Sequence, residues 1–276
     1  MCDHHHALGK AVGPGGQLQL HRRDIVRGLW TGSLVLGVAG AGGCESAGEF
    51  FAPTDDQLIM MSAEAWEQTK KETPISKDAR ANRRLQTIGP KIAAVANRPN
   101  DAWEFVVFDS ADKNAFVLPG GKVGFYKGLL DFSENDDQVA AVLGHEVGHV
   151  TARHAAQRMG QQQATSLGLA IGGAILGSST NLPEDQKNAI MAVAGAGAVV
   201  GILLPFSRSN ELDADRLGVD YMHAAGYDVR QSVRLWEKMG QNSDPGPGEW
   251  LSTHPSPQTR IAELREYINA KGYARL

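Results

Sequence analysis

Residues 145–149 of this 276-residue chain read HEVGH, so two histidines stand four positions apart and a glutamate directly follows the first. Residues four apart share one face of a helix, and the imidazoles of His145 and His149 can therefore reach a single Zn²⁺ ion. Glu146 lies beside them, where it can act as general base toward a water activated by the metal. The apolar run 139–143 before the motif predicts a helix that buries the site. The chemistry predicted is hydrolysis with one zinc ion per chain.

A third ligand must come from elsewhere, because a catalytic zinc ion has three protein ligands and a water. Residues 207–215, SRSNELDAD, predict the start of a helix, with Glu211 and Asp215 four apart on one face. Glu211 could be the third ligand, while Asp215 could orient a ligand histidine. The alternative for both is a helix start that is acidic because of the helix dipole. His154 falls off the ligand face and His223 lies on an amphipathic helix, so both are expected to be structural.

The elements that position these residues are predicted to be mainly helices with one small sheet. Thr54 and Ser76 are the expected N-caps of the first two helices. Helical spacing predicts helices at residues 55–73, 77–97, 136–159 and 257–271. Aromatic and β-branched residues predict strands at residues 103–109, 114–118 and 122–126. We expect an α+β fold, predominantly helical, with the sheet beside the helix that carries HEVGH.

Two stretches rich in Ala and Gly, 164–178 and 189–204, are the most apolar part of the chain. Each lacks charge for only about 15 residues, fewer than the roughly 20 needed to cross a membrane. A turn is predicted between them, at residues 181–185. Together they favour a buried helical hairpin, since small residues allow close packing of helices. A hairpin that dips into the bilayer or receives substrate remains the alternative.

Composition excludes several classes of function. With 27 Lys+Arg against 31 Asp+Glu, the net charge is −4, and nucleic-acid binders usually show a basic footprint instead. The 2 cysteines rule out a disulfide scaffold. The 42% hydrophobic and 21% charged fractions are ordinary for globular proteins. We therefore expect an enzyme-sized globular protein with no nucleic-acid partner.

The N-terminal residues predict an export signal. Arginines within 22–27 precede the uncharged apolar stretch 29–41, which is too short to span a bilayer. This order resembles a twin-arginine signal. Residues 41–44, AGGC, resemble a bacterial lipobox whose cysteine is lipidated, although Leu is usual where Ala41 stands; a free structural Cys44 is the alternative. The expected division is an export signal over 1–43, a tether over 44–54 and a metallopeptidase domain over 55–276.

Four separated segments together resemble one known family. They are HEVGHVTARH at 145–154, SRSNELDAD at 207–215, the NAF and PGG runs within 114–121, and STHP at 252–255 followed by Arg260. The chain resembles the gluzincin peptidases that include HtpX and the CAAX prenyl endopeptidases. It is most similar to their periplasmic branch typified by BepA, LoiP and YcaL, with mitochondrial relatives. The resemblance covers about residues 50–270. We expect the short form, without the C-terminal tetratricopeptide domain of the BepA type.

The resemblance implies roles for residues that spacing alone does not settle. It implies that Glu211 is the third zinc ligand. It also implies that the strand with Asn114, Ala115 and Phe116 lies beside bound substrate, paired through main-chain hydrogen bonds. His254 is implied to face the metal, where it would stabilise the oxyanion or act as a fourth ligand that keeps the enzyme latent. A structural role for His254 is the alternative.

The leading hypothesis is a zinc endopeptidase of the bacterial periplasm, tethered to a membrane by lipidated Cys44. The resemblance implies that its substrates are misfolded or misassembled envelope proteins. One alternative is a zinc-binding lipoprotein acting as an assembly chaperone, although a purely structural site has no use for Glu146. Another is an intramembrane protease that uses the apolar hairpin, although the hairpin is short. The outer membrane is favoured, while the acidic Glu45 could favour inner-membrane retention.

Overall fold

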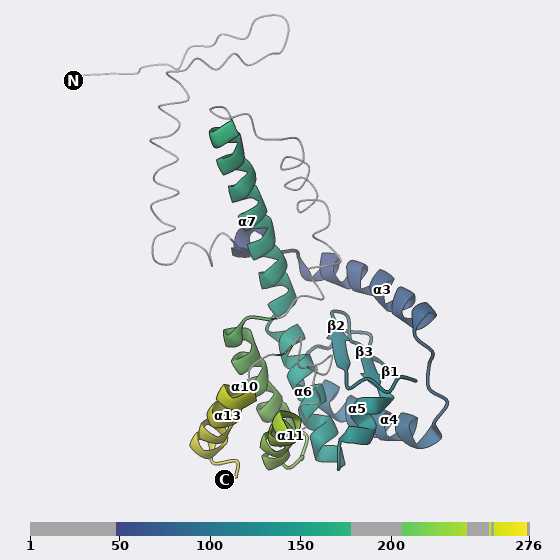
Figure 1. Ribbon diagram of the computed structural model, residues 1–276. Helices are drawn as coiled ribbons and strands as arrows, with labels where there is room; N and C mark the ends of the chain where they lie inside the picture. The colour runs from purple at the N-terminus through teal and green to yellow at the C-terminus, as the bar shows by residue number, and fades with distance from the viewer. Residues whose placement is uncertain (1–47, 178–205, 242–253, 255–256, 275–276) are drawn as a thin grey trace, which may run out of the picture. The chain divides into compact units, whose positions relative to one another are not determined.

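The computed structural model describes residues 48–177, 206–241, 254 and 257–274 (Figure 1). All of these residues belong to one compact unit, Ala47–Leu276. The predicted export signal and the first part of the tether, residues 44–47 with Cys44, lie outside the described residues. So do the second apolar stretch, 189–204, and the turn predicted before it.

Helices dominate the described part of the chain, and three short strands lie within residues 104–126. In chain order, the elements are α3 (Asp55–Glu72), α4 (Ala79–Val95), β1 (Glu104–Phe108), β2 (Ala115–Leu118), β3 (Lys122–Tyr126), α5 (Lys127–Phe132), α6 (Asp136–Thr151), α7 (His154–Gly177), α10 (Arg208–Ala224), α11 (Arg230–Gln241) and α13 (Pro257–Lys271). The α+β prediction is confirmed, and the three predicted strands agree with the observed ones to within one residue at each end.

The described strands form a mixed sheet in the order β1-β3-β2. β1 runs parallel to β3 with Phe105 opposite Val123, and β2 runs antiparallel to β3 with Phe116 opposite Gly124. Gly124 is needed here, because a Cβ at this position would lie 2.4 Å from the Phe116 ring. Among the described residues β2 pairs only with β3, which makes it an edge strand.

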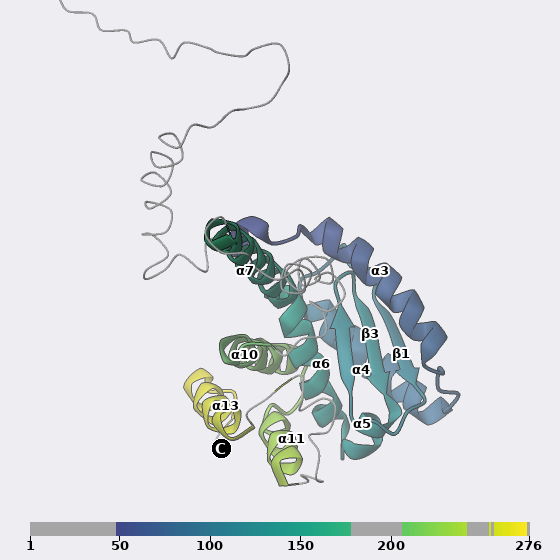
Figure 2. The same cartoon turned by 45° about the horizontal axis from the view of Figure 1, so that its top comes forward.

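Successive residues of a strand point to opposite faces, and the sheet is covered on both. Val107 and Phe125 join the main core with residues of α4 and α6. Phe108 and Leu118 pack instead with Trp66 of α3. The sheet therefore lies between α3 on one face and α4 and α6 on the other, while α10, α11 and α13 gather on the far side of α6 (Figure 2).

The central helix, α6, is buried from Gln138 to Val150 and lies against α10 at very short range. Gly144 of α6 and Gly218 of α10 make this approach possible. A Cβ on Gly144 would lie 2.8 Å from the carbonyl oxygen of Gly218, and one on Gly218 would lie 2.8 Å from the amide nitrogen of His145. The close crossing brings the HEVGH motif within side-chain reach of the first turns of α10.

The predicted cap of the first helix is confirmed, and that of the second is wrong. Thr54 accepts a hydrogen bond from the amide of Gln57, whose side chain accepts one from the Thr54 amide. In the second helix the N-cap is Asp78, whose carboxylate accepts hydrogen bonds from the amides of residues 80 and 81. Ser76 lies before the helix, where its amide donates to the carbonyl of Val107. Pairing with the sheet holds Ser76 outside the helix.

The single helix predicted over 136–159 is interrupted. α6 ends at Thr151, and α7 begins at His154 after Arg153, which has a positive φ of 57°. The Arg153 guanidinium donates to Asp55 at 2.7 Å, which stabilises the turn. The first apolar stretch falls largely in α7, which runs on to Gly177. None of the helices in the described ranges combines the length and the apolar character that a membrane span requires.

Candidate active site

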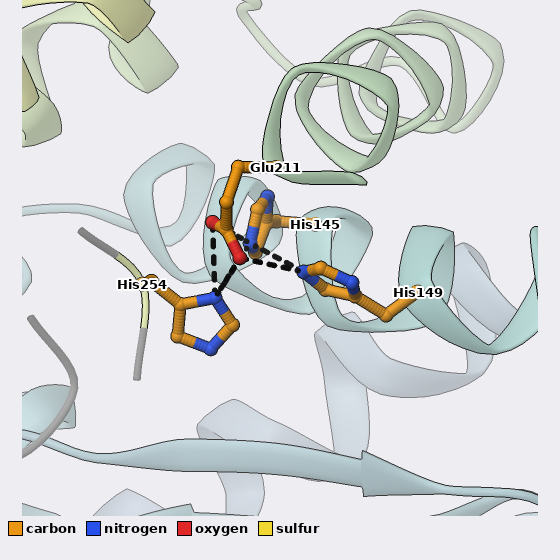
Figure 3. Close-up of side chains that lie close together, drawn as sticks. All are labelled: His145, His149, Glu211 and His254. Carbon is orange, nitrogen blue, oxygen red and sulfur yellow. Dashed lines mark hydrogen bonds and ion pairs between the residues drawn. The ribbon is translucent and has the colours of Figure 1, made fainter. Parts of the chain in front are cut away.

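In the described part of the chain, four buried side chains come together at the crossing of α6 and α10 (Figure 3). They are His145 and His149 of α6, Glu211 of α10 and His254, and they offer ligand atoms that all lie within 4.8 Å of one another. The Nε2 atoms of the two α6 histidines are 3.0 Å apart, and Nδ1 of His254 lies 3.2 Å from Nε2 of His145. Nitrogens bound tetrahedrally to one ion at 2.0–2.1 Å stand about 3.3 Å apart. The donor set therefore fits a small divalent metal ion.

His145 contacts Asp215, the residue proposed from the sequence to orient a ligand histidine. Its Nδ1 lies 2.9 Å from an Asp215 oxygen, which leaves Nε2 to face the other ligand atoms. Burial and the charge of Arg260 disfavour protonation of His145, but Asp215 and Glu211 outweigh them and raise its pKa to about 9. Burial also opposes the charge of Asp215, yet Arg260 holds the pKa of that carboxyl below its usual range. Asp215 therefore stays a carboxylate that accepts the Nδ1–H of His145.

Glu211 is a fully buried carboxylate in the first turn of α10. One oxygen lies 2.8 Å from Nη1 of Arg260, and Nδ1 of His254 lies 3.0 Å from the other. Burial raises the pKa of Glu211, but its hydrogen bonds to His145 and His254 outweigh burial and leave the pKa well below its usual range. An ionised carboxylate is the form that binds a metal ion.

Glu146 lies beside the converging ligand atoms without being one of them. It is buried on α6 directly after His145, and its carboxylate is 3.4 Å from Nε2 of His254. A general base must lie near the reacting atoms and keep its own oxygens free of the metal. Glu146 lies near the ligand atoms and is not a member of the ligand group.

The predicted substrate strand, Asn114 with β2, lies against α6. The Tyr126 amide donates to the Asn114 carbonyl, and this bond fixes which residues pair with β3. Because hydrogen-bonded and non-bonded pairs alternate in antiparallel strands, the amides and carbonyls of Ala115 and Val117 point to the outer edge of β2. The Phe116 ring packs against Trp66, on the α3 side of the sheet. The main chain of Phe116 pairs with β3, so neither its backbone nor its ring lies on the outer edge of β2.

A model of peptidase family M48 matches residues 79–268, which is more than half of the chain. The chain belongs to this family. Its relatives include the mitochondrial metalloendopeptidase OMA1 of Schizosaccharomyces pombe, 35% identical over 184 residues that make up 64% of this chain and 50% of the relative. They also include the beta-barrel assembly-enhancing protease of Escherichia coli K12, 30% identical over 206 residues, or 73% of this chain and 42% of the relative.

The peptidase spans half or less of the length of these two curated relatives. The matched family is a peptidase family, and the two relatives are named as a metalloendopeptidase and a protease. They also confirm the predicted likeness to the BepA branch. The buried group of histidines and glutamate agrees with a metal ion in this peptidase, as its family implies.

Two site residues of the peptidase have contacts that its sequence did not indicate. Arg260 appeared only as part of a motif, and it is buried between Glu211 and Asp215. Phe206, which belongs to no motif of the sequence, stacks on the His149 ring with 3.9 Å between ring centres. The sequence pointed to Arg260 only as an arginine shortly after His254, and no sequence pattern pointed to Phe206.

The other two histidines expected to be structural lie outside the ligand group. His154 contacts Nδ1 of His149 at 2.9 Å. His223 is exposed and stacks on Tyr273.

Proposed function

We propose that this M48 peptidase is a zinc endopeptidase in which His145, His149 and Glu211 hold the ion and Glu146 is the general base. The observation that carries the proposal is the convergence of those three side chains beside Glu146 in a buried site. Histidine nitrogens with one carboxylate are a donor set typical of catalytic zinc. When bound, the ion supplies Lewis-acid polarisation of the scissile carbonyl and acidifies the attacking water.

The side chains of the site divide the remaining work. The outer edge of β2 receives the peptide as an added strand, and the Ala115 and Val117 main chains bind it whatever its side chains are. Glu146 takes the proton of the attacking water and passes it to the leaving amine. Asp215 keeps His145 in the tautomer whose Nε2 faces the ion.

His254 has its Nδ1 among the ligand atoms, at 3.2 Å from Nε2 of His145. Because of this position, we propose that His254 acts as a fourth ligand of the ion and keeps the peptidase latent. Its movement away would free one position for water and substrate. The variant His254→Ala tests this role. Higher activity than wild type supports the latch, and lower activity supports the oxyanion-stabilising role instead.

For location and substrates, the proposal rests on the N-terminal pattern and on a relative's name. Residues 22–44 have the order of an export signal with a lipobox. One of the relatives is named a beta-barrel assembly-enhancing protease. We propose that the chain is exported to the bacterial periplasm, anchored by lipid on Cys44, most favourably in the outer membrane. There it would degrade misfolded or misassembled envelope proteins. Membrane fractionation of wild type beside Cys44→Ser tests the anchor.

The catalytic proposal is tested by degradation of casein, with bound zinc quantified in each variant. Glu146→Gln should keep one zinc per chain and lose about 10²–10⁴-fold in rate, the usual contribution of a general base. Glu237→Gln, the same change at a residue that pairs with Arg265 on the surface, is the matched control. If wild type and Glu146→Gln both bind zinc and neither cleaves unfolded protein, the catalytic proposal fails and the chaperone alternative replaces it.

A further inference from the structure

Arg260 is a charged side chain with no exposed surface, in the first turn of α13. Its guanidinium lies 3.5 Å from the centre of the Trp236 ring, which covers it from α11. Burying a guanidinium is costly unless charged partners surround it. Its partners are the carboxylates of Glu211 and Asp215, which stand one helical turn apart on α10. One cation therefore bridges the carboxylate predicted to bind the metal and the carboxylate that orients a metal-binding histidine.

The planar guanidinium reaches the two carboxylates with different edges. Nε and Nη2 contact the two oxygens of Asp215 at 2.6 and 2.5 Å, a bidentate pair. Nη1 contacts one oxygen of Glu211 at 2.8 Å. Such a fork fixes the plane of a carboxylate as well as its position, which a lysine ammonium does not do. The fork therefore sets the orientation of the Asp215 carboxylate, and Nη1 adds an ion pair with one oxygen of Glu211.

These orientations decide where the ligand atoms lie. The fixed Asp215 presents an oxygen 2.9 Å from Nδ1 of His145 and so directs the opposite ring nitrogen into the ligand group. The Glu211 oxygen that does not contact Arg260 lies 3.5 Å from Nε2 of His149. Arg260 thus contacts the predicted ligand Glu211 directly, and it acts on His145 both through Asp215 and through Nη2, which lies 3.1 Å from Nδ1 of His145. Arg260 is not a ligand itself.

We propose that Arg260 is a positioning residue that holds the metal ligands in place and makes metal binding depend on the docking of α13. The proposal rests on the proposed function, because it takes His145, His149 and Glu211 as the ligands. His254 precedes the first residue of α13 by only three positions, so the same helix also anchors the predicted latch. A displacement of α13 would loosen the ligands and the latch together.

The test uses the full chain and compares Arg260→Lys with Arg216→Gln. Arg216 pairs with Glu263 at 3.1 Å and also joins α10 to α13, but at the surface, so it is the matched control. Zn²⁺ affinity is measured by competition with a chromogenic chelator. The visible spectrum of the Co²⁺-loaded protein reports the coordination geometry. Arg260→Lys should weaken Zn²⁺ binding by about 10–100-fold, the usual effect of losing a group that orients a ligand. It should also alter the Co²⁺ spectrum, while Arg216→Gln changes neither.

Urea unfolding of the metal-free proteins separates positioning from folding. A merely structural Arg260 would lower the stability of metal-free Arg260→Lys but leave the Zn²⁺ affinity and the Co²⁺ spectrum of the folded protein unchanged, and that result overturns the proposal. If Arg260→Lys does not fold, Asp215→Asn breaks the same contact from the other side and should weaken Zn²⁺ binding in the same way. Failure of the wild-type chain to bind either metal would overturn the proposed function as well, whereas unchanged affinity in Arg260→Lys beside an active wild type overturns this inference alone.

Discussion

Nδ1 of His149 lies 2.9 Å from Nδ1 of His154, across the break between α6 and α7. The Nε2 atom of His149 faces His145, and with Nε2 as the proposed metal ligand it is Nδ1–H of His149 that would donate to His154. Nε2 of His154 in turn lies 3.3 Å from Asp213. Burial lowers the pKa of His154, in keeping with a neutral ring that accepts from one neighbour and donates to the other. The two α6 histidines therefore have different partners: His145 contacts Asp215, and His149 contacts His154, which in turn contacts Asp213.

This contact predicts that His154→Phe weakens metal binding by about tenfold, because the His149 ring loses the acceptor that holds its tautomer. His154→Gln, which keeps an acceptor, should restore part of the affinity. Competition with a chelator gives both values. His223→Phe on α10 is the control, since that histidine is exposed and stacks on Tyr273. Equal affinity of wild type and His154→Phe would show that His149 does not need this contact.

The outer edge of β2 predicts a defect in substrate binding that leaves the fold intact. Val117→Pro removes an amide that points away from β3, a position where an edge strand tolerates proline. The loss of one hydrogen bond, about 0.5–1.5 kcal/mol, should raise KM for a peptide substrate several-fold with little change in the unfolding midpoint. Phe116→Pro removes an amide that pairs with β3 and should destabilise the sheet instead. A Val117→Pro protein with unchanged KM would exclude strand pairing at this edge.

Local features of the sequence predicted the parts of the site that lie within one helix. The convergence of His145 and His149, with Glu146 beside them, follows from helical spacing. Spacing also puts Asp215 one turn from Glu211 on α10, but its contact with His145 depends on the crossing of α6 and α10. That Glu211 and His254 come to the same point was implied by the family resemblance. Spacing alone could not predict this convergence, because these residues meet only through the crossing of α6 and α10.

The features that the sequence did not predict depend on long-range contacts. The break after Thr151 is invisible in the apolar pattern, which continues through it, and it depends on Arg153 reaching Asp55. Ser76 is as good a cap as Asp78 by type, and only its pairing with β1 excludes it from the helix. Arg260 stands among ordinary helical residues, so nothing local indicates that its guanidinium is buried.

The contacts of Trp66 and Lys70 on α3 with Glu104 on β1 predict that the stability of the protein depends on pH. Burial opposes the charge of Glu104, but hydrogen bonds from Trp66 and Lys70 outweigh it, and the pKa of Glu104 is lowered from 4.5 in the folded protein. Because the folded pKa is the lower one, this contribution is present above pH 4.5 and is lost as the pH falls through the folded pKa. The pair is partly exposed, so we expect no more than about 1 kcal/mol.

Urea unfolding at pH 7 and below pH 4, followed by tryptophan fluorescence, measures this contribution. Glu104→Gln should reduce the stability at pH 7 and remove this part of the pH dependence. Glu67→Gln, which removes the other carboxylate partner of Lys70, is the control, because Glu67 is largely exposed and the Trp66 indole donates to Glu104 instead. An identical pH profile for wild type and Glu104→Gln would contradict the assignment.

Metal removal should lower both activity and stability, because an ion that binds the folded state alone stabilises it by mass action. At a free Zn²⁺ concentration 100 times the dissociation constant the gain is about 2.7 kcal/mol, so the chelated protein should unfold at a measurably lower temperature. Chelation should abolish casein cleavage, and stoichiometric Zn²⁺ should restore it. In His149→Ala, added Zn²⁺ should no longer raise the unfolding temperature, because the ligand group has lost one of its two α6 histidines. A zinc-dependent rise that persists in His149→Ala would place the stabilising ion at another site.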